Sequence, residues 1–479
     1  MIALILEDAS FEQDIRELCM AFFPGEKFVY KEDPGAFFSF QVRKEGERFF
    51  CRGNMDREGE HREEAFESPW FSERILTKNS LKRNLYHMLA DFTKKQLPWG
   101  ALTGIRPTKI PMEMLERGLT RDVIQKEMQT KYLCGEEKAD LAIAVAQREY
   151  TILKEMDYQQ GYSLYIGIPF CPSRCLYCSF TSYPIVLWKK RVEEYIQALS
   201  MELKAVAELF RDRRLMTIYM GGGTPTSLEA WELREIFHCV REYFNLSHLR
   251  EFTVEAGRAD SITREKLMAL KEAGVGRISV NPQTMQQRTL DYIGRNHSVE
   301  DVERAFYTAR EIGFDNINMD FILGLKGETL EDVADSFEKV KAFEPEDVTL
   351  HSLALKRAAR LNTEHLHEAV EDEIMVKMFS IACNSCRDMG LSPYYLYRQK
   401  NIAGNLENIG FSKEGKEGIY NILIMEEKHT IAACGAGASS KIIHPMEKRI
   451  ERIENVKDPG LYVERIQKII ARKKRELCH

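Results

Sequence analysis

Six short runs of β-branched and other apolar residues recur through the middle of the chain, and helical patterns separate them. The runs are SLYIGI (163–168), LMTIYM (215–220), EFTVEA (251–256), RISVN (277–281), NINMDFIL (316–323) and DVTLHSLAL (347–355). Strands that alternate with helices predict a parallel sheet with right-handed crossovers. Six units are fewer than a closed eight-stranded barrel contains. We therefore expect residues 160–360 to form a partial (β/α)6 barrel of the α/β class, with its ligand at the carboxyl ends of the strands.

The segments before and after this region lack the alternation. FFSFQVRKEGERFFCRG (37–53) predicts a hairpin, and the charged stretch 55–67 is expected to be a solvated loop or helix face. With a helical pattern over 72–95, this predicts a small α+β domain of unknown role over residues 1–150. Residues 361–479 are expected to form an α+β extension, a candidate cover for the substrate. It ends in a basic, solvated amphipathic helix near 463–475.

Composition narrows the class of protein. Hydrophobic residues make up 44% of the 479 residues, and the formal net charge is -6, which argues against a dedicated nucleic-acid binder. No run approaches the roughly 18 apolar residues that a membrane span needs. The 11 cysteines follow no disulfide-framework pattern. These features predict a cytoplasmic protein whose thiols stay free or bind metal.

The strongest chemical motif is CPSRCLYC, which directly follows the first predicted strand of the barrel. Its three cysteines, Cys171, Cys175 and Cys178, are suited to ligate three irons of a four-iron, four-sulfur (4Fe–4S) cluster and to leave the fourth iron open. A zinc site is the first alternative, but zinc prefers four closed ligands and no fourth cysteine or histidine lies suitably near in the sequence. Unligated cysteines at a chance spacing are the second alternative.

Further candidate residues follow the later strands. YMGGGTPTSL (219–228) ends the second strand, and its glycines allow close backbone approach to a ligand, although a tight turn is the usual reason for such a run. Isolated polar residues at later strand ends are Glu255, Gln283 and Asp320. Each could instead cap a helix or satisfy a loop. Their corresponding positions on three strands favour the lining of one pocket.

The order of these motifs resembles that in the oxygen-independent coproporphyrinogen III oxidases of the radical S-adenosylmethionine (SAM) superfamily. The resemblance rests on YIGIPFCPSRCLYC, GGGTPTSL, TVEAG, SVNPQT, GRNHS and NMDFILGL, and LTGIRPTKIP and YRQKNIAGNLENIGF resemble the HemZ-type branch. It implies a 4Fe–4S cluster on the three cysteines and one or two bound SAM molecules. The residues implied to contact SAM are Tyr165, Gly222, Gly223, Thr224, Glu255, Gln283, Arg295, Asp320 and Ala354.

The resemblance also implies an activity, the oxidative decarboxylation of coproporphyrinogen III propionates to vinyl groups without oxygen, which gives protoporphyrinogen IX. Two positions depart from the oxidase pattern, because Phe180 replaces a cysteine and Gly167 replaces a histidine. Both changes resemble a chaperone-like branch, whose heme motif lacks its histidine here at Gly404. The alternatives are therefore a heme-binding chaperone-like protein and a radical SAM enzyme that acts on heme.

The implied substrate and reductant suggest further partners. A tetrapyrrole with four carboxylates needs cationic groups, for which Arg258, Arg398 and Lys400 are candidates, with surface solvation as the alternative for each. No catalytic side chain is assigned beyond the cluster and SAM. An electron donor protein such as flavodoxin or ferredoxin is expected, and no nucleic acid.

Overall fold

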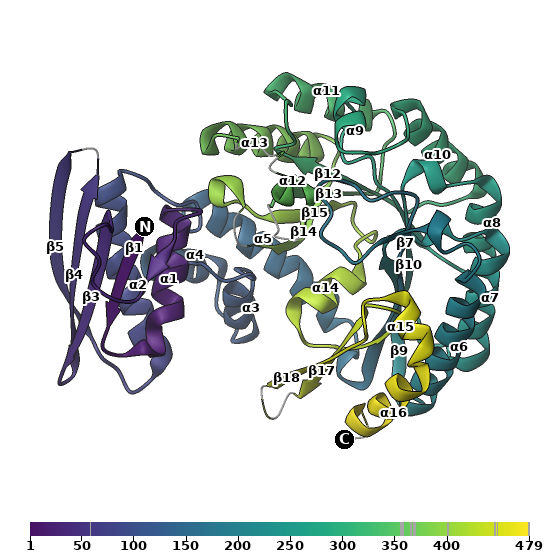
Figure 1. Cartoon of the computed structure of the whole chain (residues 1–479), viewed down its shortest axis with the longest axis horizontal. Coiled ribbons are helices and arrows are strands. Elements are labelled where there is room, and N and C mark those ends of the chain that lie inside the picture. The colour runs from purple at the N-terminus through teal and green to yellow at the C-terminus, as the bar shows by residue number, and fades with distance from the viewer. Residues whose placement is uncertain are drawn as a thin grey trace. The chain divides into compact units, whose positions relative to one another are not determined.

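The computed structural model describes residues 1–57, 59–354, 359–364, 366, 370–399, 402–444, 447 and 449–477, with the side chain of residue 403 left out. The chain folds into two units. The first combines Met1–Gln147 with Tyr397–Glu407, and the second combines Arg148–Leu396 with Asn408–His479. Figure 1 follows the chain from its purple N-terminus to its yellow C-terminus. The domain limits 1–150, 160–360 and 361–479 stay predictions.

The first unit contains a five-stranded sheet in the order β2-β1-β3-β4-β5. Its strands are β1 (Ile2–Leu6), β2 (Phe28–Val29), β3 (Phe38–Glu45), β4 (Arg48–Arg57) and β5 (Glu60–Pro69). β3 and β4 form the expected antiparallel hairpin, with Glu45 paired to Arg48. The expectation of a loop or helix face over 55–67 is wrong, because this stretch forms the end of β4 and most of β5. Its charged side chains lie on a ladder in which Cys51 pairs with Phe66.

Helices cover one face of this sheet (Figure 1). Alternate residues of β3, namely Phe38, Phe40 and Val42, are buried in a core that they share with α1 and α2. The helices of this part of the chain are α1 (Glu12–Phe22), α2 (Arg74–Thr93), α3 (Lys109–Glu116), α4 (Arg121–Tyr132) and α5 (Glu136–Lys154). The helix expected over 72–95 is thus confirmed as α2.

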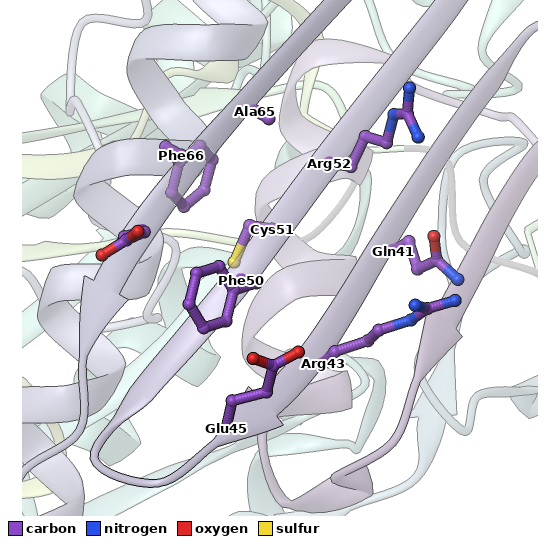
Figure 2. A pocket seen from close by; sticks show the side chains of 9 residues that line it. Gln41, Arg43, Glu45, Phe50, Cys51, Arg52, Ala65 and Phe66 are labelled. Atoms are coloured by element: carbon purple, nitrogen blue, oxygen red, sulfur yellow. The ribbon is translucent and has the colours of Figure 1, made fainter.

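A pocket of about 490 Å³ lies along β3, β4 and β5 (Figure 2). It contains none of the site residues expected from the sequence. Its lining residues are Gln41, Arg43, Glu45, Phe50, Cys51, Arg52, Ala65, Phe66 and Glu67.

The second unit contains the predicted parallel sheet, and its strands follow in the order β6-β9-β10-β11-β12-β13. They are β6 (Gly161–Ile168), β9 (Arg214–Gly222), β10 (Glu251–Gly257), β11 (Arg277–Val280), β12 (Ile317–Leu323) and β13 (Asp347–Ser352). Each pairs in parallel with its neighbour. The partial barrel is confirmed.

Helices line the outside of this sheet (Figure 1). They are α6 (Val192–Leu209), α7 (Ala230–Tyr243), α8 (Arg264–Glu272), α9 (Gln287–Tyr292), α10 (Val299–Ile312) and α11 (Leu330–Lys341). Capping boxes begin three of them, with Glu229 and Glu232 at α7, Ser298 and Asp301 at α10, and Thr329 and Asp332 at α11. These reciprocal side-chain bonds explain why the helices begin directly after the strand-end loops.

The sheet continues beyond the six predicted strands at both ends, so that it has eleven strands among the described residues. β14 (Ser392–Tyr397) and β15 (Asn408–Ser412) follow β13, and β15 pairs with β13 in antiparallel register. At the other end β16 (Thr430–Cys434) pairs in parallel with β6, and β17 (Ser439–His444) and β18 (Arg449–Glu454) complete the edge. The C-terminal residues therefore extend the barrel sheet itself.

The remaining helices are α12 (Arg360–Thr363), α13 (Asp372–Asp388), α14 (Ile419–Glu426), α15 (Pro459–Glu464) and α16 (Ile466–Leu477). The helix expected near 463–475 corresponds to α16. Within the described parts of the chain, no helix has both the length and the apolar character needed to cross a membrane.

Candidate functional site

The cysteine motif lies directly beyond β6, on a loop with defined structure. The short strands β7 (Phe170–Cys171) and β8 (Tyr183–Pro184) pair in parallel, so the chain after the motif folds back beside Cys171. Cys171 and Cys175 are buried, and Cys178 is half-buried. The Thr224 hydroxyl donates a hydrogen bond to Cys171 Sγ at 3.4 Å. This contact joins the motif to the glycine turn that follows β9.

The donor set of this loop fits a cluster that takes one thiolate per iron. Burial raises the pKa of Cys171 to about 11, which the hydrogen bond from Thr224 partly offsets, so a metal must displace protons when it binds. Among the described residues, no three histidine, cysteine, aspartate or glutamate side chains are grouped to hold a single metal ion. Ligands of separate irons need not converge on one point.

The glycine turn packs tightly against the chain that leads into Cys171. The amide of Gly223 donates to the Ile168 carbonyl and the amide of Thr224 to the Phe170 carbonyl, each at 2.7 Å. A β-carbon on Gly223 would lie 2.5 Å from the Phe170 oxygen, and Gly222 has a φ of +109°. Only glycine fits these two positions without strain. The turn therefore needs glycine for packing, and its contact with SAM stays a prediction.

Glu255 lies at the end of β10 under a group of aromatic rings. The Tyr219 hydroxyl donates to Glu255 Oε1 at 2.6 Å. Tyr219 stacks on Tyr420 with ring centroids 4.5 Å apart, and Tyr165 stacks on Tyr219 at 6.2 Å. Burial raises the pKa of Glu255 to about 7, against the opposing effect of the Tyr219 hydrogen bond. A carboxyl poised near neutrality can exchange a proton or accept a hydrogen bond at this place.

Gln283 and Asp320 are joined by the backbone at the ends of β11 and β12. The Gln283 amide donates to the Asp320 carbonyl at 2.9 Å, and Gln283 holds a φ of +72°. The Asp320 carboxylate accepts from Asn318 at 2.7 Å and lies 3.9 Å from His351 Nε2. Burial would raise the pKa of Asp320, but His351 and Asn318 outweigh it and hold that pKa below its usual value.

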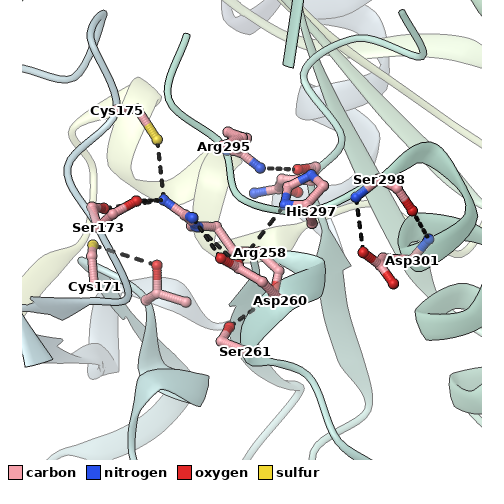
Figure 3. Close-up of polar contacts among 12 residues, drawn as sticks. Cys171, Ser173, Cys175, Arg258, Asp260, Ser261, Arg295, His297, Ser298 and Asp301 are labelled. Atoms are coloured by element: carbon pink, nitrogen blue, oxygen red, sulfur yellow. Dashed lines mark hydrogen bonds and ion pairs between the residues drawn. The ribbon is translucent and has the colours of Figure 1, made fainter. Parts of the chain in front are cut away.

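Two arginines reach the cysteine motif. Arg295 donates to the hydroxyl of Tyr177, which lies between the second and third cysteines, at 2.9 Å. Arg258 lies directly after β10, and its Nη1 donates to Cys175 Sγ at 3.5 Å (Figure 3). The same guanidinium binds the Asp260 carboxylate through Nε and Nη2, at 2.9 and 2.6 Å. The contacts of Arg258 thus direct it to the cysteine loop, and its expected role in substrate binding stays untested.

The other expected residues do not join this group. Arg398 belongs to the first unit, where it is buried and donates to the Leu102 carbonyl and to Asn405. Burial lowers the pKa of Arg398 to about 10. Ala354 is half-buried just beyond β13, and Lys400 lies outside the described residues. The structure therefore gives neither Arg258 nor Arg398 an open position at the strand ends.

Sequence patterns did not single out several residues that the fold brings to the site. Tyr420 is the second residue of α14 and lies far from Tyr219 in the sequence, and no local motif marks it. His351 has a detectable signal, because it is a titratable residue near the carboxyl end of a barrel strand, as Asp320 is. Asp260 and His297 follow barrel strands, and their relation to the cysteines appears only in three dimensions.

Comparisons with known proteins agree with this geometry. The profile described as the Radical SAM superfamily matches residues 165–340. The chain is 40% identical over 395 residues to the oxygen-independent coproporphyrinogen-III oxidase-like protein HemZ of Bacillus subtilis (strain 168). This match covers 81% of this chain and 79% of that protein. It is 33% identical over 285 residues to the heme chaperone HemW of the same strain, covering 58% of this chain and 71% of that protein.

The fold is also similar to a solved structure, the coproporphyrinogen III oxidase HemN from Escherichia coli, a radical SAM enzyme. The TM-score is 0.54 at 20% sequence identity, and the match covers 66% of this chain and 72% of that chain. At this identity the similarity shows a shared fold.

Proposed function

Because the chain belongs to the HemZ-type branch of the radical SAM superfamily, we propose that it oxidatively decarboxylates coproporphyrinogen III without oxygen. Members of this superfamily use a 4Fe–4S cluster and SAM. Each turnover would remove one hydrogen atom, one molecule of CO2 and one electron from a propionate and leave a vinyl group. Two turnovers would give protoporphyrinogen IX. The observation that carries the proposal is the junction of the cysteine loop and the glycine turn at neighbouring strand ends.

The chain's own residues would bind and orient the cofactors. When bound, the cluster supplies one electron to SAM, and cleavage of SAM provides the radical that abstracts hydrogen from the substrate. Cys171, Cys175 and Cys178 would hold the cluster as thiolates. The glycine turn after β9 leaves backbone open to a ligand. Glu255, with its pKa near 7, is placed to accept a hydrogen bond from the ammonium or the ribose of SAM.

The aromatic rings beside Glu255 would exclude water. Tyr165 and Tyr219 lie on the neighbouring strands β6 and β9, and the ring of Tyr420 from α14 stacks on both of their rings. A radical that abstracts hydrogen needs a dry and shaped site, because side reactions compete with the intended one. Asp320 and His351 supply polar groups on the far strands of the same sheet. We propose that this arrangement holds at least one SAM molecule, with Gln283, Arg295 and Ala354 contributing further contacts.

The expected electron donor protein, such as flavodoxin or ferredoxin, would approach the chain next to the cysteine loop. Residues 158–192 contain four arginines and lysines and no aspartate or glutamate. Leu187 is 75% exposed, directly after the β8 strand that pairs with Cys171, and Lys189 and Lys190 are exposed next to it. Basic groups around an apolar contact are complementary to an acidic partner.

A heme chaperone-like function is the second candidate. The similarity to HemW and the replacement of a cysteine by Phe180 favour it. Phe180 is 64% exposed two residues after Cys178, where an apolar ring can contact a tetrapyrrole. In this alternative the protein would bind heme and would not turn coproporphyrinogen III over.

An anaerobic assay of the reconstituted full chain with SAM, dithionite and coproporphyrinogen III distinguishes the two functions. We expect vinyl product, CO2 and 5′-deoxyadenosine in the wild type. Cys175→Ala should lose the cluster's visible absorbance and all 5′-deoxyadenosine formation. Cys239→Ala is the matched control, because Cys239 is buried in α7 and its thiol lies in hydrogen-bonding contact with Ser200. Stoichiometric heme binding without vinyl product would favour the chaperone instead.

A further inference from the structure

The guanidinium of Arg258 is enclosed by protein, and each of its nitrogens has a partner. The side chain is only 4% exposed in its pair with Asp260. Nη1 donates to the Ser173 carbonyl at 3.1 Å and to the Ser173 hydroxyl at 2.8 Å, in addition to Cys175 Sγ. Figure 3 shows this guanidinium between the sulfur of Cys175 and the carboxylate of Asp260. All of its donor nitrogens are therefore already engaged by groups of the protein.

Burying the cationic Arg258 side chain costs desolvation free energy. Burying an ion pair removes two charges from water, and apolar residues of similar volume often stabilise a protein as well as the pair does. The Arg258–Asp260 pair does more than fill space in the core. It ties the turn between the first two cysteines to β10, across 83 residues of sequence between Arg258 and Cys175.

The residues behind Arg258 set the charge of this group. Asp260 accepts the bidentate contact from Arg258, and His297 Nδ1 lies 3.8 Å from Asp260 Oδ1. Burial would raise the pKa of Asp260, but His297 and Arg258 outweigh it and hold that pKa well below its usual range. Burial lowers the pKa of His297. At neutral pH, Arg258 is thus a cation next to the sulfur of Cys175, Asp260 is an anion behind it, and His297 is neutral.

We propose that Arg258 is a positioning residue that fixes the Ser173–Cys175 turn and makes the cluster on Cys171, Cys175 and Cys178 easier to reduce. This rests on the proposed function, because it requires the cluster. Reduction adds negative charge, and a charged N–H donor to a ligand sulfur stabilises the more negative state. Asp260 opposes this effect and limits it. The reduction potential therefore depends on the balance between the two side chains.

The test measures the midpoint potential of the reconstituted cluster in the full chain by a redox titration followed by electron paramagnetic resonance. Arg258→Gln removes the cation and should shift the midpoint to a more negative potential. Asp260→Asn removes the anion and should shift it in the opposite direction. The double variant removes both charges and should return toward the wild type. Arg264→Gln is the matched control, because Arg264 is 58% exposed on α8 and pairs with Glu311.

A second readout follows iron directly. Removal of a group that orients a metal ligand typically weakens metal binding by roughly 10- to 100-fold, so Arg258→Gln should lose iron to a chelator faster than the wild type by a factor in that range. Arg258→Lys keeps the charge and should have a midpoint between those of the wild type and Arg258→Gln. It also serves as the test if Arg258→Gln does not fold.

The outcomes separate the two proposals. Equal midpoints in the wild type and all variants would overturn the role of Arg258 and leave the cluster assignment intact. Shifts of the same sign in Arg258→Gln and Asp260→Asn would indicate only a loosened loop, and would overturn it as well. A wild-type protein that takes up no four-iron cluster would instead contradict the proposed function.

Discussion

The carboxyl group of Glu255 illustrates how one neighbour controls a residue at the site. Burial raises its pKa to about 7, and the hydrogen bond from Tyr219 keeps that pKa from rising further. Tyr219→Phe removes a bond to a charged group, worth about 1.5–3 kcal/mol, and 1.36 kcal/mol corresponds to one pKa unit. We expect the pKa of Glu255 to rise by about one to two units in this variant. The pH profile of SAM binding, measured by equilibrium dialysis, should shift upward by the same amount.

A tyrosine elsewhere in the same unit provides the control. Tyr307 is 48% exposed on α10, and Tyr307→Phe should leave the SAM binding profile unchanged. If Tyr219→Phe bound SAM with the wild-type pH profile, Glu255 would not be the group that titrates in binding.

Residues that follow barrel strands could be predicted from the sequence, and residues that depend on tertiary contacts could not. The cysteines, the glycine turn and Glu255 each follow an apolar run, so a parallel sheet necessarily places them at one edge. The place of Arg258 next to the cysteine loop, and not in an open substrate position, depends on a contact with Cys175 that no local pattern marks. Tyr420 reaches the ring of Tyr219 because the first amides of α14 donate to Glu251 on β10, a contact that no local pattern marks.

At the scale of elements, one buried carboxylate of the barrel contacts both C-terminal helices. Glu202 of α6 accepts from Lys473 of α16 at 2.7 Å and from the Tyr462 hydroxyl of α15 at 2.6 Å. It also accepts from Asn455 and from the amide of Gly435, each at 2.8 Å. Lys473→Met would leave a buried charge without its cation, which costs about 3–5 kcal/mol. Chemical denaturation of the full chain should show a loss of that size.

The adjacent lysine gives a matched control for this prediction. Lys474 is 51% exposed and pairs with Glu208 at the surface, so Lys474→Met should change the free energy of unfolding by less than about 0.5 kcal/mol. Glu202→Gln combined with Lys473→Met should cost less than Lys473→Met alone. A loss in Lys473→Met no larger than in Lys474→Met would show that Glu202 does not depend on this cation.

The same helix shows where the sequence pattern was misleading at this scale. A basic amphipathic helix predicts a solvated polar face, and Lys468, Lys474 and Arg475 are exposed as expected, but Lys473 is buried. The expectation for the charged stretch 55–67 was wrong for a different reason, because strand pairing with β4 overrides its high charge. Where alternation of apolar runs and helices was regular, as in the six barrel strands, the pattern alone was sufficient.

At the scale of the whole molecule, the first unit is built from two distant stretches of chain. Residues 397–407 complete it, and Glu407 within them accepts from Trp99 Nε1 at 2.8 Å and from Lys138 Nζ at 2.6 Å. The Glu407 side chain is fully buried and that of Lys138 is 10% exposed. Stability can differ between such units, because parts of one chain open with different free energies.

Glu407→Gln tests whether the two units respond separately. The amide keeps the shape of the side chain but removes the charge that balances Lys138, so the first unit should lose about 3 kcal/mol of stability. Hydrogen exchange followed by mass spectrometry should show faster exchange within residues 1–147 and unchanged exchange in the six barrel strands. Iron content should stay at the wild-type level, because all three cysteines belong to the second unit. Lys473→Met should give the reverse distribution. Loss of iron in Glu407→Gln would mean that the cluster requires the fold of the first unit, and that the two units unfold as one cooperative structure.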